Sequence, residues 1–247
     1  MAAPRAGWQS ATLRDKRTET DRAATLHLLT DAWPGHRAGQ HVDVRLTAED
    51  GYQAQRSYSI ASPPEDDGDV ALTVERLDDG EVSPYLVDEM APGDMCELRG
   101  PIGGWFVWDA DDGGPLLLVG GGSGVVPLMS MLRHRAALHS GVPARLLLSA
   151  RSLDDVLYAD ELHGLDAGDD ELDVSITLTR TAPPEWPGYA RRVDRSMLEE
   201  VAWPAADRPH VYVCGPTPFV ESVAAGLVDL GHDAGLVKTE RFGATGS

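Results

Sequence analysis

The sequence predicts two domains: an antiparallel six-stranded β-barrel over residues 1–109, followed by an α/β domain with a doubly wound parallel sheet over residues 110–247. Three observations predict this. Short segments that alternate apolar with polar residues fill the first half, and uniformly apolar segments that alternate with helical ones fill the second. A stretch rich in Asp and Gly, residues 109–114, separates the two patterns and is typical of a domain boundary.

In the first half, residues 24–28 and 41–46 alternate apolar with polar side chains, and residues 70–74 follow a loop rich in Pro and Asp. Such segments, bounded by Pro, Gly and Asp, are typical of an antiparallel sheet or barrel. One helix is expected from Pro84 to Met90, with Ser83 as its N-cap and Pro84 at its first position.

In the second half, residues 116–119, 145–149 and 210–214 have uniformly apolar centres. Such runs, separated by helical segments, indicate buried parallel strands in βαβ units. The first run leads through the glycine-rich residues 120–124 into an apolar stretch over residues 125–138, which we expect to be a helix.

Composition narrows the function classes. Forty acidic against 21 basic residues give a net charge of −19, and both predicted domains are acidic, which argues against nucleic acid or an anionic membrane as partner. The 2 cysteines exclude a disulfide scaffold and any four-cysteine zinc or iron–sulfur site within this chain. The 8 histidines show no metal-ligand spacing, so no metal is expected.

No apolar run is long enough to span a bilayer, and the first residues lack the apolar core of a signal peptide. From these features we expect a cytoplasmic protein without membrane contact.

The turn at Gly122, Ser123 and Gly124 lies between a predicted strand and a predicted helix. Glycines let a backbone approach a ligand closely, and a helix N-terminus offers free N–H groups to a phosphate. Pro127 stands where the Rossmann fingerprint has its third glycine. The turn alone therefore leaves both phosphate binding and a tight structural corner open.

The next strand ends at Arg151 and Ser152, where Rossmann domains specific for NAD carry a carboxylate for the ribose 2′-hydroxyl. An arginine beside hydroxyl groups suits a 2′-phosphate instead. This predicts a preference for NADPH over NADH; the alternative is a solvated loop arginine.

Further motifs carry a family resemblance. Residues 56–59, Arg-Ser-Tyr-Ser, resemble the Arg-x-Tyr-Ser flavin motif of the ferredoxin–NADP reductase superfamily, and residues 80–83, Gly-Glu-Val-Ser, are similar to its second flavin segment. Residues 122–127, 213–216 and 240–243 are similar to its nicotinamide-domain signatures. The resemblance extends over nearly the whole chain, with the motifs in the family's order.

The resemblance implies a flavin site in the barrel. Arg56 would pair with the flavin pyrophosphate, Tyr58 would lay its ring against the isoalloxazine, and Ser59 would hydrogen-bond flavin N5. Ser83 would bring backbone donors and a helix N-terminus to the pyrophosphate. The remaining flavin-binding residues expected are Ser57, Val74, Gly80 and Val82. For each, the alternative is a residue that merely fills the barrel wall.

It also implies a hydride-transfer site, lined by Ser59, Cys214 and Glu240 as catalytic residues. Cys214 would lie near nicotinamide C4, with Gly215 and Pro216 beside the nucleotide. Phe242 would cover the flavin face that the nicotinamide must reach. Plastid-type relatives end on a tyrosine at this place, whereas this chain continues through residues 243–247.

The expected function is a flavoprotein reductase, with FAD favoured over FMN because the family usually carries it. Hydride passes from NADPH, or NADH, to flavin N5, and electrons then pass to a separate acceptor: a ferredoxin, an oxygenase component, or a small molecule such as free flavin or quinone. Two alternatives stay open. One is a flavin or iron-chelate reductase without a protein partner, and the other is a non-catalytic, redox-sensing flavoprotein subunit.

Overall fold

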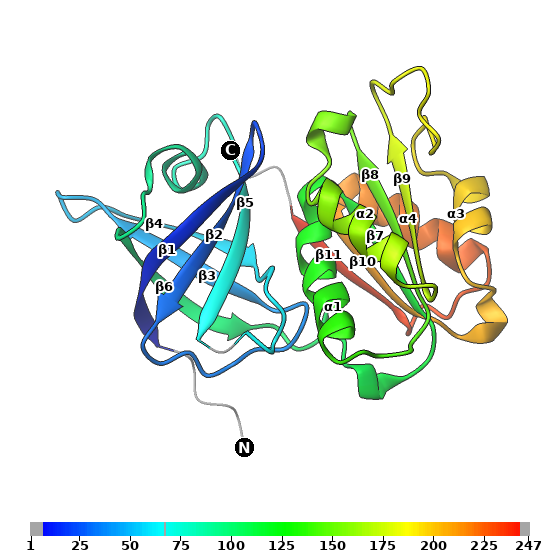
Figure 1. Cartoon of the computed structure of the whole chain (residues 1–247), viewed down its shortest axis with the longest axis horizontal. Coiled ribbons are helices and arrows are strands. Elements are labelled where there is room, and N and C mark those ends of the chain that lie inside the picture. The colour runs from blue at the N-terminus through cyan, green and yellow to red at the C-terminus, as the bar shows by residue number, and fades with distance from the viewer. Residues whose placement is uncertain (1–6, 67, 243–247) are drawn as a thin grey trace.

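The computed structural model describes residues 7–66 and 68–242, which form two lobes side by side (Figure 1). The first lobe contains the strands β1 (Trp8–Thr20), β2 (Ala23–Thr30), β3 (His41–Thr47), β4 (Gln53–Ser59), β5 (Asp69–Glu75) and β6 (Met95–Ile102). The second contains β7 (Leu116–Gly121), α1 (Val125–Ala137), β8 (Ala144–Ala150), α2 (Ala159–Gly168), β9 (Leu172–Leu178), α3 (Arg195–Val201), β10 (His210–Pro216), α4 (Thr217–Asp229) and β11 (Val237–Phe242). The predicted fold class is confirmed.

The first lobe is a six-stranded antiparallel sheet in the order β4-β3-β6-β1-β2-β5. It curls around an apolar core, because alternate residues of each strand face inward. The edge strands β4 and β5 are joined by a single isolated bridge between Ile60 and Leu72. The barrel is therefore incompletely closed along the line where β4 and β5 face each other.

The second lobe has five parallel strands in the order β11-β10-β7-β8-β9. Residues of α1 and α2 share one apolar cluster with one face of this sheet, and residues of α3 and α4 share another with the opposite face. Both faces are covered, which explains the uniformly apolar strand centres. Parallel strands place all their carboxyl ends along one sheet edge, where ligands of such folds bind.

The predicted cap at Ser83 is wrong. The helical turn after β5 is a π-helix, Tyr85–Glu89, preceded by Pro84 with no side-chain cap. The Ser83 hydroxyl instead accepts a hydrogen bond from the Leu77 N–H at 3.0 Å, so it fixes the loop after β5. A serine before a proline satisfies the sequence rule for an N-cap, but the loop N–H competes for its oxygen.

Buried polar contacts join the lobes. Tyr158 begins α2 in the left-handed conformation and donates its hydroxyl to Thr73 of β5. From α1, Arg133 donates to the Ala61 carbonyl at 2.6 Å and Ser130 donates to the Ser62 carbonyl at 2.7 Å. These bonds hold the α/β lobe against the strand and loop that border the barrel opening.

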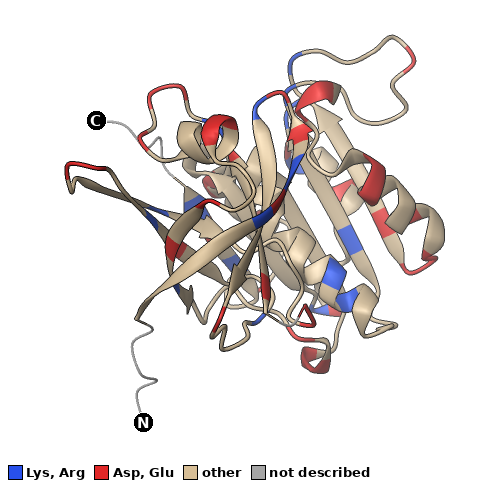
Figure 2. Ribbon diagram, turned by 60° about the vertical axis from the view of Figure 1, so that its left-hand side comes forward, with Lys and Arg blue, Asp and Glu red and all other residues tan. Residues whose placement is uncertain are grey.

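Acidic residues occur along both lobes, with basic residues among them (Figure 2). Within residues 7–66 and 68–242, no helix combines the length and the apolar character that crossing a membrane requires.

Candidate active site

The pairing of β3 with β4 divides the first flavin motif between two faces. Ser59 lies opposite His41, and Ser57 lies opposite Asp43. Because directly opposed residues point to the same face of a sheet, these side chains share one side. Ser57 donates to Asp43 at 2.6 Å, which fixes this part of the strand pair.

Tyr58 and Arg56 point to the other face, next to the opening between the edge strands. Tyr58 packs against the barrel core, and burial raises the pKa of its hydroxyl, so the phenol stays uncharged. Arg56 reaches beyond the core and pairs with Glu81 at 2.9 Å. Its guanidinium is a partly exposed fork held at the opening, which suits a diphosphate group.

The second flavin segment, residues 80–83, closes the opening from the side of β5. Val74 and Val82 are completely buried in the barrel core, so the accessible part of this segment is Gly80 and Glu81. Gly80 leaves room for Ser83, whose Oγ would lie 2.9 Å from a Cβ at that position. The segment thus offers a compact backbone surface opposite Arg56, and it fits a flavin dinucleotide along the barrel opening.

At the sheet edge, parallel pairing places Cys214 directly between Gly120 and Glu240 on the neighbouring strands. Burial, with the Glu240 charge, raises the pKa of the Cys214 thiol well above its usual value. The cysteine is therefore an uncharged thiol at neutral pH, unlike a nucleophilic cysteine.

The glycine turn packs against this cysteine. Residues Gly122–Gly124 form a single 3-10 turn ahead of α1. A Cβ at Gly124 would lie 2.2 Å from the Cys214 carbonyl oxygen, so only glycine permits this approach. The close packing sets the free N–H groups at the start of α1 beside the end of β10. Both alternatives for the turn, a phosphate site and a tight structural corner, stay open.

Glu240 extends from β11 to the barrel, where its Oε1 lies 3.6 Å from Nδ1 of His41. Its Oε2 is buried and has no hydrogen-bond partner among residues 7–66 and 68–242. Burial raises the pKa of Glu240 to about 7 and lowers the pKa of His41. His41 was not among the residues predicted from sequence, because a lone histidine in a strand carries no signal of its distant partner.

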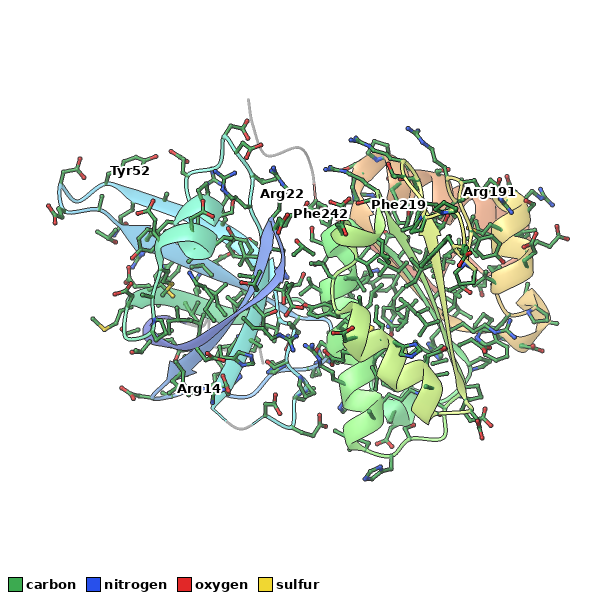
Figure 3. The ribbon with its side chains drawn as sticks, turned by 45° about the horizontal axis from the view of Figure 1, so that its top comes forward. Arg14, Arg22, Tyr52, Arg191, Phe219 and Phe242 are labelled. Carbon is green, nitrogen blue, oxygen red and sulfur yellow. The ribbon has the colours of Figure 1, made fainter. Side chains whose placement is uncertain are left out.

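The ends of β10 and β11 bring Pro216 level with Phe242. Phe242 is exposed and lies between the two lobes, whereas Phe219 lies farther into the α/β lobe (Figure 3). The role of Phe242 as an aromatic cover for the flavin stays a prediction. Residues 243–247, which follow it, lie outside the described residues.

Arg151 is exposed at the end of β8, and its carbonyl accepts the N–H groups of Arg180 and Thr181, which follow β9. Two arginines therefore stand at adjacent strand ends. Sequence reasoning missed Arg180, although its place directly after a strand is comparable to that of Arg151. Ser152 donates to Asp155 at 2.5 Å, so its hydroxyl has a partner within the loop.

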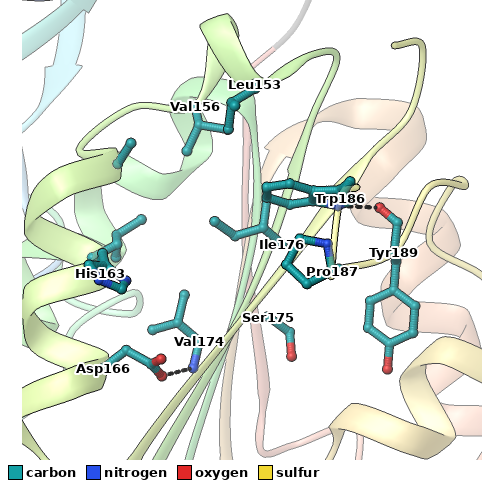
Figure 4. A pocket seen from close by; sticks show the side chains of 13 residues that line it. Leu153, Val156, His163, Asp166, Val174, Ser175, Ile176, Trp186, Pro187 and Tyr189 are labelled. Carbon is teal, nitrogen blue, oxygen red and sulfur yellow. Dashed lines mark hydrogen bonds between the residues drawn. The ribbon is translucent and has the colours of Figure 1, made fainter. Parts of the chain in front are cut away.

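A separate hollow of about 730 Å³ lies beside β9, between α2 and the segment that includes Trp186 (Figure 4). Within it, Asp166 accepts the Val174 N–H at 2.8 Å. None of the predicted site residues lines this hollow. It is therefore distinct from the place where the two lobes bring Glu240 and His41 together.

Comparison with known proteins defines the class. Residues 11–107 match the oxidoreductase FAD-binding domain family, and residues 118–225 match the oxidoreductase NAD-binding domain family. The chain is 37% identical to ferredoxin–NADP reductase B of Sorangium cellulosum, over 83% of this chain and 84% of that protein. It is an NAD(P)H-dependent flavoprotein oxidoreductase.

The glycine betaine monooxygenase reductase subunit of Chromohalobacter salexigens is 32% identical over 85% of this chain, which spans 56% of that protein. Among solved structures, the FAD/NAD-binding domain of nitric oxide dioxygenase from Vibrio cholerae has the same fold, with a TM-score of 0.85, 24% identity, and 97% and 100% of the two chains covered. The chain belongs to the ferredoxin–NADP reductase superfamily.

Proposed function

We propose that this protein transfers hydride from NADPH to FAD bound along the barrel opening and passes the electrons to a separate acceptor. The observation that carries the proposal is the contact between Glu240 and His41. It brings the carboxyl end of β11 to the barrel strand directly opposite Ser59, the serine of the flavin motif.

Each residue then has a role that its surroundings support. The flavin, when bound, supplies the hydride-accepting and electron-releasing chemistry. Arg56 and the backbone of residues 80–83 would hold the pyrophosphate, and Tyr58 would support the ring system. Around the reacting atoms, Ser59 would offer a hydroxyl and Cys214 an uncharged thiol, and Glu240 would hold a proton near neutral pH.

We further propose that Arg151 and Arg180 together bind the 2′-phosphate of NADPH. Replacing either by alanine is expected to raise KM for NADPH about tenfold, because a charge-assisted contact is lost, and to leave KM for NADH nearly unchanged. Arg195→Ala, an exposed arginine at the start of α3, is the control. Equal effects on both nucleotides would contradict the assignment.

The acceptor is proposed from the relatives and the sequence together. Relatives include a reductase subunit of glycine betaine monooxygenase, a reductase component of propane 2-monooxygenase and a ferredoxin–NADP reductase. The 2 cysteines of this chain cannot ligate a four-cysteine cluster. These two facts favour a separate ferredoxin or oxygenase component over a small-molecule acceptor such as quinone.

Anaerobic stopped-flow mixing of the flavin-loaded protein with NADPH, and separately with NADH, tests the proposal through the flavin absorbance. Fast bleaching with NADPH and slower bleaching with NADH are expected. The reverse preference would keep the reductase and remove the role of the arginines. No bleaching with either nucleotide would favour the redox-sensing alternative.

A further inference from the structure

His41 lies where the two lobes meet. It starts β3, with Ser59 opposite it on β4 and Ile102 opposite it on β6. Its ring faces Glu240 of β11 with a separation of 3.6 Å between Nδ1 and Oε1. This is an ion-pair distance, longer than a direct hydrogen bond. The imidazole therefore stands between the flavin-motif strand and the buried carboxyl.

The neighbourhood of the pair contains few other charges. Asp43, two residues along β3, is the charged neighbour that acts on His41, and Asp43 is itself tied to Ser57 and Arg99. On the strand beside Glu240, Cys214 is an uncharged thiol. The loop after β6 contributes Gly103, where a Cβ would make ordinary van der Waals contact with the ring, 3.6 Å from Nδ1.

The nearby basic side chains bind groups other than Glu240. Lys238, two residues before Glu240 on β11, donates to the Val107 carbonyl and the Tyr212 hydroxyl, both at 3.0 Å. Arg99 is engaged by Asp43. His41 is thus the basic group at ion-pair distance from Glu240 among the described residues.

We propose that His41 is a positioning residue that exchanges one proton with Glu240 across the lobe interface and thereby sets the pH at which this carboxyl changes charge. The exchange balances: the carboxyl O–H breaks, an imidazole N–H forms, and a neutral pair becomes a carboxylate with an imidazolium. Burial disfavours both charged forms singly, but at this separation each stabilises the other. The functional meaning, though not the proton exchange itself, rests on the proposed role of Glu240 in hydride transfer.

The coupling is reciprocal, because two interacting sites must change each other's proton affinity by the same factor. We expect Glu240→Gln to lower the pKa of His41 by about one unit, and His41→Phe to raise the pKa of Glu240 by about the same amount. His41→Gln, which keeps an N–H donor but cannot titrate, is expected to give an intermediate shift for Glu240.

The experiment is nuclear magnetic resonance titration of the flavin-loaded protein, labelled with ¹⁵N-histidine or with ¹³C-carboxyl glutamate. The signals of His41 and Glu240 are assigned by their loss in the respective variants. His27→Gln is the matched control, because His27 also lies in a barrel strand at ion-pair distance from a carboxylate, Asp69, away from Glu240. Independent titration of His41 and Glu240, with no reciprocal shift, would overturn the proposal.

The pH profile of nucleotide-driven flavin reduction is the second readout. In His41→Phe the inflection attributed to Glu240 should move upward by the same amount as in the titration, and in His27→Gln it should stay in place. Reciprocal shifts without flavin reduction would retain the proton exchange and reject the proposed function. Flavin reduction without reciprocal shifts would support the proposed function and reject the proton exchange.

Discussion

At the scale of single residues, Glu240 combines two properties that seldom occur together in a carboxylate. Its side chain is largely withdrawn from solvent, and its Oε2 is buried without a partner among the described residues. A structural carboxylate is normally paired on both oxygens, since an unpaired buried charge costs free energy. Burial therefore disfavours the charged form of Glu240 in the free protein, and we propose that its surroundings serve hydride transfer rather than the fold.

The first prediction concerns stability and pH. Glu240 has a pKa of about 7 in the native state, above its ordinary value of 4.5. Between these values the folded protein retains a proton that the unfolded chain releases, so the contribution of Glu240 to stability falls as pH rises. Relative to wild type, Glu240→Gln should gain on the order of 3 kcal/mol of unfolding free energy between pH 4 and pH 8.

Urea denaturation of both proteins at the two pH values measures this difference. Glu199→Gln, on an exposed position of α3, is the control and should show no comparable change with pH. An unchanged difference between wild type and Glu240→Gln at the two pH values would show that the native pKa of Glu240 is not raised.

At this scale the sequence motifs name some candidate residues of the site and leave out others. Sequence reasoning predicted Arg56, Ser59, Cys214 and Glu240 because they stand in motifs. It missed His41, which lies near Glu240 only because β11 reaches the barrel in the folded chain. Contacts between distant segments have no local signature, so motifs can propose candidate site residues but cannot propose a neighbour that lies outside the motifs.

At the scale of elements, the glycine turn before α1 is the most constrained segment of the α/β lobe. Gly124 meets the backbone of Cys214 and Gly215, which cannot move aside as a side chain can. Gly164, inside α2, has open space around its missing Cβ. A side chain at Gly124 would therefore clash with backbone atoms, whereas a side chain at Gly164 would meet open space.

We therefore predict opposite effects of the same substitution. Gly124→Ala should destabilise the protein by about 1–3 kcal/mol through overpacking, and should weaken NADPH binding because the start of α1 shifts. Gly164→Ala should stabilise it by about 0.5–1 kcal/mol, because alanine loses less backbone entropy in a helix. Thermal denaturation and nucleotide titration measure both. A neutral Gly124→Ala would show that the turn adapts more readily than its contacts suggest.

Strands were predicted best where one face or both faces of the strand are buried. The alternation in β3 and the apolar run in β7 identified both strands, because side-chain period follows the faces that are buried. Five strands were not identified from the sequence: β1, β4, β6, β9 and β11. β1 has a largely polar sequence with only Ala11 and Leu13 fully buried, and β9 lies at a sheet edge. Where tertiary packing rather than local pattern forms a strand, sequence periodicity is too weak to show it.

At the scale of the whole molecule, the net charge of −19 is the dominant property. Acidic groups cover both lobes, so an approaching anion is repelled from most directions (Figure 2). Such long-range forces act on association rates and are screened by salt, with a Debye length of about 10 Å at 0.1 M ionic strength.

From this we predict that reduction of ferricyanide, a small anionic acceptor, accelerates by a factor of about 2 to 10 as ionic strength rises from about 10 mM to about 200 mM. The neutral acceptor benzoquinone should show little change under the same conditions. Steady-state turnover of the flavin-loaded protein measures both rates. A ferricyanide rate that falls with salt would reveal a locally basic surface at the exit for electrons.

The contact made by Arg133 has a consequence for how nucleotide enters and leaves. One guanidinium donates to the Ala61 carbonyl of the barrel and to Glu161 of α2, and lies 4.9 Å above the ring of Tyr158. Swinging one lobe from the other would break the bond to Ala61 together with the bonds that Ser130 and Tyr158 make to Ser62 and Thr73. The lobes should therefore behave as one rigid body. Nucleotide exchange is then expected to require only small movements of groups between the lobes, while the lobes themselves keep their relative position.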